Sequence, residues 1–314
     1  MESIATRDAY GQALKKLGEE HQNVVVLDAD LSKSTKTVDF AKAFPDRFFN
    51  MGIAEQNLIA TAAGLSTTGK VVFASSFAVF ATGRAFEQIR NSVAYAGLNV
   101  KICATHAGLT VGEDGGSHQA IEDIAIMRSL PNMRVIVPAD GPSAAKAVQA
   151  IYKEPGPVYL RLGRPKVPVI YGEDLDYKIG KANKLRGGTD VGILACGYMV
   201  HKALEAADAL KERGIQAAVV DVHTIKPLDR ETILEVAKVT GCLVTAEEHS
   251  IIGGLGGAVA ELISEEFPVP IERVGVQDKF GQSGPPDKVV DLYGLTTAEI
   301  IGKAEKTIAR KAKK

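Results

Sequence analysis

The chain has 314 residues, 46% of them hydrophobic and 24% charged, and this length suits two domains that each bury a core. Its formal net charge of -1 excludes a general electrostatic attraction to nucleic acid or to anionic membranes. No segment approaches the ~20 apolar residues of a membrane span, and the first residues lack the apolar core of a signal peptide. We therefore expect a cytoplasmic protein that binds anions through a few placed residues.

Cysteine and histidine usage indicates neither a disulfide framework nor a metal centre. The three cysteines, Cys103, Cys196 and Cys242, are odd in number and each lies in an apolar run, which favours buried reduced thiols. The six histidines include no pair at the spacing that binds a metal on one helix face. We therefore predict no metal site in this chain.

The first half of the chain has the pattern of strands that alternate with helices. Short runs rich in Val and Ile begin at Val24, Val71, Val100, Met133 and Pro157. Apolar runs with little polar alternation are typical of parallel strands covered on both faces. We expect one open α/β domain over residues 1–175.

A polar, glycine-containing segment follows and predicts a linker over residues 176–189. Similar apolar runs then begin at Val191, Ala217, Cys242 and Pro270. The helix expected after Gly197 has its apolar residues on one face, namely Val200, Ala203, Leu204, Ala207 and Leu210. We expect a second α/β domain over residues 190–314, and hence two open, mostly parallel sheets that are each flanked by helices.

Two segments resemble nucleotide-binding motifs only in part. Residues 64–70 have P-loop spacing, but Val71 stands where Ser or Thr must reach magnesium. The segment from Ile252 has Val259 at the last glycine position of a dinucleotide fingerprint. We interpret this second segment as a glycine turn that lets a helix pack closely. Without a dinucleotide-binding fingerprint, the hypothesis that the protein is a dehydrogenase loses its main support.

Polar segments follow strands of the first domain at residues 29–34, 52–57, 75–80 and 105–119. Because ligands of open α/β sheets bind at the carboxyl ends of strands, these segments form one candidate site. The last of them interleaves four glycines with His106, Glu113, Asp114 and His118. Glycines suit a backbone that approaches a ligand or adopts positive φ, and two imidazoles beside acids suit proton transfer. The alternative is a flexible surface loop with solvated histidines.

Glu55 and two phenylalanines are further candidates. A carboxyl at an apolar helix start, near Ile53 and Leu58, would be desolvated and could share a proton with a heterocyclic nitrogen unless it is paired. An ordinary exposed helix glutamate is the alternative. Phe77 and Phe80 are three residues apart, so on a helical turn they could wall a flat aromatic ligand, or they could pack in the core.

Taken in order, these segments resemble the pyrimidine-binding and C-terminal domains of transketolase over essentially the whole chain. The long segment 105–119 is highly specific for the family, and GIAEQ at 52–56 is moderately specific. The other segments support the resemblance because they occur in the family's order. Those others are ATR at 5–7, ADLSKS at 29–34, SFAVF at 76–80, RSLPNMRVIVPAD at 128–140 and LGRP at 162–165.

The resemblance implies thiamine diphosphate as the cofactor. It makes Glu55 the residue that hydrogen-bonds a ring nitrogen of the aminopyrimidine, which allows the cofactor's ylid to form and to do the carbanion chemistry. Phe77 and Phe80 would line the pyrimidine pocket. Asp30 is also implied at the cofactor, with the alternative that a buried strand-end aspartate braces its loop.

The resemblance also implies a sugar-phosphate site. His106 and His118 match residues that bind the substrate's hydroxyls and carbonyl oxygen, and Asp114 matches one that contacts a donor hydroxyl. The phosphate would be held by Arg7, Ser34 and Arg164, since guanidinium groups bind phosphate with paired donors. Lys33 departs from the family pattern beside Ser34 and leaves the contact of Ser34 open.

One expected motif is missing. The family holds diphosphate and magnesium with a Gly-Asp-Gly run and a later Asn, and this chain contains no such run. We therefore expect a partner, an N-terminal transketolase subunit, to hold the diphosphate and magnesium, and we expect Met1 to begin where that domain would have ended. The resemblance suggests two copies of each chain in a heterotetramer, with this chain inactive alone.

The resemblance thus implies transfer of a two-carbon ketol unit from a ketose phosphate to an aldose phosphate, as in the pentose phosphate pathway. A beta subunit of a 2-oxo acid dehydrogenase has the same plan, although residues 112–119, Arg7 and Arg164 argue against it. An enzyme like deoxyxylulose-phosphate synthase fits less well around residues 105–118. The alternative of another class is a non-catalytic scaffold subunit.

Overall fold

The computed structural model describes residues 2–311, and its largest sheet has seven strands in the order β12-β6-β7-β5-β4-β2-β3. Neighbouring strands are parallel except β12 and β6, which pair antiparallel. The strands are β2 (Val24–Asp28), β3 (Phe48–Asn50), β4 (Val71–Phe77), β5 (Val100–Thr105), β6 (Arg134–Ile136), β7 (Val158–Arg161) and β12 (Thr224–Lys226).

A second sheet has five strands in the order β14-β13-β10-β11-β9 and is parallel except at β9. Its strands are β9 (Asn183–Arg186), β10 (Val191–Ala195), β11 (Ala217–Asp221), β13 (Leu243–Ser250) and β14 (Ile271–Val276). Two further short strands, β1 (Ser3–Ala5) and β8 (Lys166–Pro168), pair antiparallel. The predicted α/β class with two mostly parallel sheets is confirmed.

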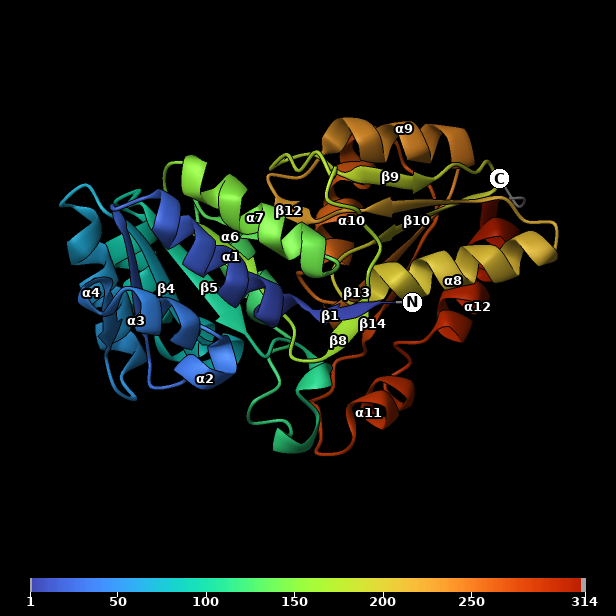
Figure 1. The fold of residues 1–314 in the computed structure, drawn as a ribbon. Coiled ribbons are helices and arrows are strands. Elements are labelled where there is room, and N and C mark those ends of the chain that lie inside the picture. The colour runs from blue at the N-terminus through green and yellow to red at the C-terminus, as the bar shows by residue number, and fades with distance from the viewer. Residues whose placement is uncertain (1, 312–314) are drawn as a thin grey trace.

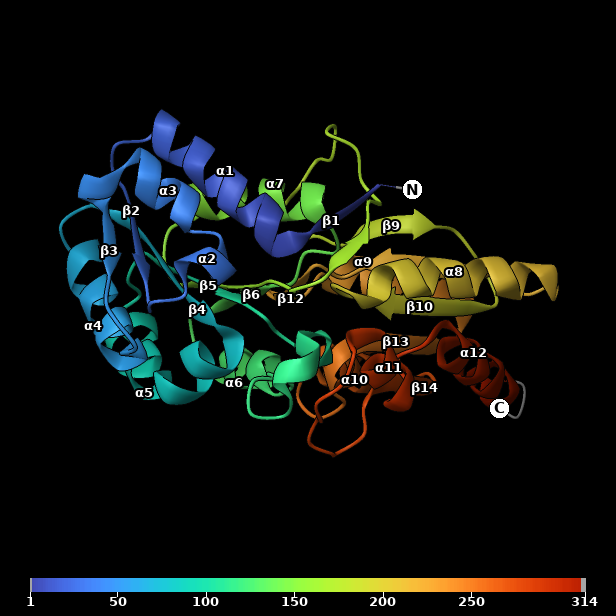
Figure 2. The same ribbon diagram turned by 60° about the horizontal axis from the view of Figure 1, so that its bottom comes forward.

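Helices cover both faces of each sheet (Figures 1 and 2). On the seven-stranded sheet, α1 (Thr6–Glu20), α3 (Val38–Ala43) and α7 (Gly141–Lys153) lie on one face, with α4 (Glu55–Ser66) and α6 (Asp123–Ser129) on the other. On the five-stranded sheet, α8 (Met199–Glu212) and α12 (Thr297–Lys311) lie opposite α9 (Arg230–Thr240) and α10 (Leu255–Glu266). The shorter helices are α2 (Ser32–Thr35), α5 (Phe86–Gln88) and α11 (Pro286–Leu292).

The strands show why the sequence predicts sheets buried on both faces. Along β2, Val24 and Val26 pack in the cluster of α1 and α7, whereas Val25 and Leu27 pack in the cluster of α4. Strand residues that alternate between two apolar clusters must be apolar at every position, which gives an unbroken run. The expected apolar face of α8 is also observed, with Val200, Ala203, Ala207 and Leu210 buried, although Leu204 is only partly so.

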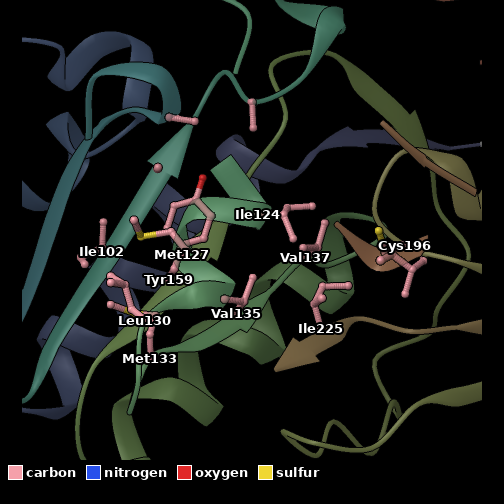
Figure 3. Close-up of a cluster of buried hydrophobic side chains, with 14 of the residues drawn as sticks. Ile102, Ile124, Met127, Leu130, Met133, Val135, Val137, Tyr159, Cys196 and Ile225 are labelled. Carbon is pink, nitrogen blue, oxygen red and sulfur yellow. The ribbon is translucent and has the colours of Figure 1, made fainter. Parts of the chain in front are cut away.

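The two halves of the chain share one hydrophobic cluster. Figure 3 shows part of it, in which Ile102 of β5, Met127 of α6 and Tyr159 of β7 belong to the same cluster as Cys196 and Ile225 from the second half. The first sheet likewise contains β12, a strand from the second half. The halves are therefore packed as one body, and the expected boundary between them stays a prediction.

Other sequence predictions can be compared with local structure. Residues 176–189, expected as a linker, include β9, the edge strand of the second sheet. All three cysteines are buried and free, as predicted. A Cβ at Gly256 of α10 would lie 2.9 Å from Thr245, which confirms close helix packing there. Within residues 2–311 no helix has the length and apolar character needed to cross a bilayer.

Candidate functional site

Three of the polar segments meet at one edge of the seven-stranded sheet. Strands β2, β4 and β5 are parallel neighbours, with Asp28 opposite Ser75 and Phe77 opposite Thr105. The segments 29–34, 75–80 and 105–119 therefore leave the sheet at its carboxyl edge, side by side. This is the place where open parallel sheets bind ligands.

Four aromatic rings gather at this edge. The ring of Phe77, which ends β4, stacks on the imidazole of His106 with centroids 3.9 Å apart. Phe80 lies 6.0 Å from Phe77 and meets His118 edge-on at 5.2 Å. Phe77 is buried, whereas Phe80 and His118 are half-buried. The structure thus combines both phenylalanines and both histidines into one partly open aromatic group.

Glu55 is buried at the start of α4 and is paired with an arginine. Its side chain is 2% exposed, and both carboxylate oxygens accept from Nη1 of Arg84, at 3.1 and 3.0 Å. Arg84 belongs to η2 (Phe80–Arg84), a π-helical turn, and its guanidinium lies 4.4 Å from the centre of the Phe80 ring. Leu58 is buried as expected, but Ile53 is exposed and does not desolvate the carboxyl.

His106 is held as a neutral imidazole of one tautomer. Nη1 of Arg7 lies 3.3 Å from Nε2 of His106, and since arginine can only donate, Nε2 must accept. The remaining hydrogen is then on Nδ1, which lies 2.8 Å from the hydroxyl of Thr105. Burial, followed by the charges of Arg7 and Arg164, lowers the pKa of His106 to about 3. Its backbone has a left-handed φ of 58°, which is uncommon outside glycine.

Cationic side chains lie on the same side as His106. Nη1 of Arg7 also donates to the backbone oxygen of Ser34 at 3.0 Å, so residue 34 contacts Arg7 through its carbonyl. Arg164 is half-buried and donates from Nη1 to the carbonyl of Val111 and to Oε2 of Glu113. These guanidinium groups form a surface suited to an anion such as phosphate.

Two predicted acids are exposed. Asp114 lies at the end of η4 (Leu109–Asp114), a 3-10 turn, and its side chain is exposed. Asp30 accepts from the side chain of Asn50 at 2.9 Å and is also exposed. The expectation that a buried aspartate at position 30 braces the loop is wrong, because Asp28 does this instead. The buried carboxylate of Asp28 accepts from the N–H of Leu31 and from the hydroxyls of Thr35 and Thr37.

The family of the chain follows from its match to two domain models. Residues 2–169 match the transketolase pyrimidine-binding domain, and residues 180–300 match the transketolase C-terminal domain. The chain belongs to the transketolase family. The resemblance noted in the sequence is therefore confirmed.

Transketolase-family relatives of similar length cover almost the whole chain. A putative transketolase C-terminal section of Methanocaldococcus jannaschii is 54% identical over 292 residues, which is 92% of each chain. A 6-deoxy-6-sulfo-D-fructose transketolase subunit of a Clostridium species is 44% identical and covers 97% of this chain and 95% of its own. The transketolase of Homo sapiens is 38% identical over 99% of this chain, but only half of the human protein is matched.

Solved transketolase structures agree with the fold. A split-gene transketolase, described as an inactive β4 tetramer, superposes with a TM-score of 0.91 at 56% identity and covers 99% of this chain and all of its own. A Campylobacter jejuni transketolase gives a TM-score of 0.83 at 23% identity, which supports the fold alone, with 46% of that protein matched.

Arg84 is the residue at this transketolase site that the sequence did not single out. Its spacing of four from Phe80 predicts a shared helical face, and this signal alone could have drawn attention to it. Nothing in the sequence links it to Glu55, which is 29 positions away. Within residues 2–311, no cluster of three or more His, Cys, Asp or Glu side chains could hold a metal ion.

Proposed function

We propose that the chain is the pyrimidine-binding half of a split transketolase and transfers a two-carbon ketol unit from a ketose phosphate to an aldose phosphate. The observation that carries this proposal is the buried carboxylate of Glu55, which Arg84 joins to the ring of Phe80 beside Phe77. A flat aminopyrimidine fits such a place, because the rings offer stacking and the carboxylate can hold a proton at a ring nitrogen. The bound cofactor, thiamine diphosphate, would supply the carbanion chemistry.

The neighbouring cations support a phosphorylated substrate. Arg7 and Arg164 flank His106, which is neutral and whose ring nitrogens contact Arg7 and Thr105, so a substrate hydroxyl or carbonyl oxygen would replace one of these contacts. His118 and Asp114 on the same loop would contact the sugar, and the peptide at Ser34, whose carbonyl contacts Arg7, would lie at the phosphate end. A 2-oxo acid such as pyruvate has no phosphate and could offer these guanidinium groups only the carboxylate next to its reacting carbonyl.

The proposed enzyme needs a diphosphate-binding part that these 314 residues do not supply. The site offers rings, a carboxylate and cations, but the Gly-Asp-Gly run that holds diphosphate and magnesium in the family is missing from the sequence. The matched relatives include the human transketolase, which is about twice as long, and a separate subunit of matching length. We propose an N-terminal transketolase subunit as the partner, which would hold magnesium and the diphosphate, with two copies of each chain.

Substrate choice and Glu55→Ala test the proposal together. The chain is mixed with an N-terminal transketolase section, thiamine diphosphate and magnesium, and is offered xylulose and ribose phosphates or pyruvate. We expect ketol transfer between the sugar phosphates, and Glu55→Ala should lower kcat on the order of 10²–10⁴-fold because proton exchange at the ring is lost. Turnover of pyruvate alone would favour a 2-oxo acid dehydrogenase, and pyruvate with glyceraldehyde phosphate a deoxyxylulose-phosphate synthase. Unchanged activity in Glu55→Ala would favour a scaffold subunit.

A further inference from the structure

The second half of the chain is in direct contact with the loop that carries both site histidines. Glu248, near the end of β13, has a buried side chain whose Oε1 accepts from the backbone N–H of Thr110 at 2.7 Å. Thr110 lies in η4, between His106 and His118. The carboxylate is therefore bonded to the middle of the site loop, although it belongs to the other sheet.

Glycines let the loop approach this carboxylate and its neighbours. Gly108 has a φ of 81°, and a Cβ there would lie 2.3 Å from the carboxyl carbon of Glu248. The other three loop glycines lie against residues 281–286 in the same way: an added Cβ would lie 2.8 Å from Pro286 at Gly112, 2.3 Å from Ser283 at Gly115 and 2.8 Å from Gly281 at Gly116. The glycine density of the loop is thus explained by contact with the second half as well as by positive φ.

The same strand also holds the segment that follows the loop. The N–H of Ser250 donates to the carbonyl of Ile121 at 2.7 Å, and the N–H of Ala125 donates to Nε2 of His249 at 3.3 Å. Arg161 joins the two halves, since its Nη2 donates to the carbonyls of Glu248 and Ala120 at 2.9 and 3.2 Å. The end of β13 is therefore a rigid support for residues 106–125.

We propose that Glu248 is a positioning residue that fixes η4 and so places His118 and Asp114 for substrate. The placement of substrate by this loop rests on the proposed function, but the effect of Glu248 on the loop conformation does not depend on catalysis. Without the acceptor, the buried N–H of Thr110 loses its partner, and a loop with four glycines has many other conformations open to it. The second half would then serve as the frame of the substrate site.

Amide hydrogen exchange on the full chain tests the positioning role without a partner or a substrate. Glu248→Met keeps the side-chain volume and removes the acceptor, whereas Glu248→Gln keeps an acceptor oxygen. We expect exchange within residues 106–119 to rise roughly tenfold or more in Glu248→Met and to stay near the wild-type rate in Glu248→Gln. Exchange in β2 and β4 should be unchanged. Glu248→Asp, which withdraws the carboxylate, should give the same change if Glu248→Met fails to fold.

Glu247 provides a matched control. It is buried next to Glu248, but its carboxylate accepts from the N–H groups of Leu255 and Gly256 at the start of α10. Glu247→Gln and Glu247→Met should leave exchange of residues 106–119 at the wild-type rate. Equal protection of the loop in wild type and Glu248→Met, or equal loosening in Glu247→Met, would overturn the positioning role.

Kinetics of the reconstituted enzyme add a second readout. Glu248→Met should raise the KM for the ketose phosphate on the order of tenfold, with rescue by Glu248→Gln, while the affinity for thiamine diphosphate stays the same. A loss of cofactor affinity of the same size would contradict the proposal. The two proposals can fail separately. If Glu248→Met loosens the loop in the exchange experiment but neither the wild type nor any variant transfers ketol groups, the proposed function is wrong and the positioning role stands.

Discussion

His106 occupies an environment in which a charged imidazole is strongly disfavoured. It stacks on Phe77, it accepts from Arg7, and Arg164 adds a second positive charge nearby. A histidine of this kind can orient a polar substrate atom through hydrogen bonds, but it does not store a proton at neutral pH. Glu55 differs from it in being an acid whose buried carboxylate is paired with Arg84.

His106 should therefore stay neutral far below the usual histidine range. Its folded pKa of about 3 lies below the unfolded value of 6.5, so the unfolded chain binds more protons between these pH values. The contribution of His106 to stability is present above about pH 6.5 and is lost as the pH falls toward 3. Nitrogen-15 NMR of the imidazole should show no titration between pH 5 and 8. A midpoint near 6.5 would contradict the contact with Arg7, and His106→Asn identifies the resonance.

Arg84 should stabilise the chain through Glu55 in the absence of cofactor. In Arg84→Met the buried carboxylate loses its partner, so we expect the free energy of unfolding to fall by about 1–2 kcal/mol, a value reduced because the arginine is half exposed. Urea unfolding at neutral pH measures this change. Glu55→Gln in the Arg84→Met background should recover most of the loss. If the single variant were as stable as wild type, the pair would contribute nothing.

Among the elements, those with long apolar runs could be predicted from the sequence and the short ones could not. Strands β2, β4, β5 and β10 are mainly apolar and rich in Val and Ile or Phe, so their pattern indicates buried strands. β9 has the sequence NKLR and β12 only three residues, and both form because a neighbouring strand offers an edge. Such pairing depends on tertiary contacts that local sequence does not contain.

The same distinction applies to the site. The sequence left Glu55 open between a desolvated carboxyl and an exposed helix residue, and the structure shows it buried at the start of a helix in which Leu58 and Ile59 are also buried. Its pairing with Arg84, the contact of Arg7 with His106 and the support by Glu248 join residues 29 to 138 positions apart. Spacing along one helix or strand cannot predict contacts of that length. The sequence located the segments of the site, and the structure supplied their internal bonds.

Strand β11 ends in a buried carboxyl that makes stability depend on pH. Asp221 accepts from the hydroxyl of Tyr171 at 2.7 Å, and burial, together with nearby Asp140, raises its pKa to about 7. This is above the unfolded value of 3.8, so the folded chain binds more protons in this range, and stability falls as the pH rises from about 4 to 7.

Asp221→Asn should remove this dependence while its amide oxygen still accepts from Tyr171. We expect the variant to exceed wild type by roughly 2–4 kcal/mol at pH 8, with a smaller difference at pH 5. Urea unfolding at the two pH values checks this. A variant that is less stable than wild type at pH 8 would show that the ionised carboxylate is stabilising.

At the scale of the whole molecule, the chain is a single packed body. Its two sheets share a hydrophobic cluster, and the second half supports the loop that carries His106 and His118. In our proposal, Glu55 and the aromatic rings hold the pyrimidine end of a cofactor, whereas these 314 residues contain no Gly-Asp-Gly run for its charged end. We therefore propose that a partner subunit holds the charged end.

Calorimetric titration of thiamine diphosphate with magnesium tests this proposal most directly. The titration is made into this chain, into an N-terminal transketolase section, and into an equimolar mixture of the two, with the mixture containing Glu55→Ala as a control. We expect tight, saturable binding of thiamine diphosphate only in the wild-type mixture, and weaker binding when Glu55 is replaced. An activity assay of the same samples should show ketol transfer only in the wild-type mixture. Tight cofactor binding accompanied by sugar-phosphate turnover in this chain alone would contradict the account.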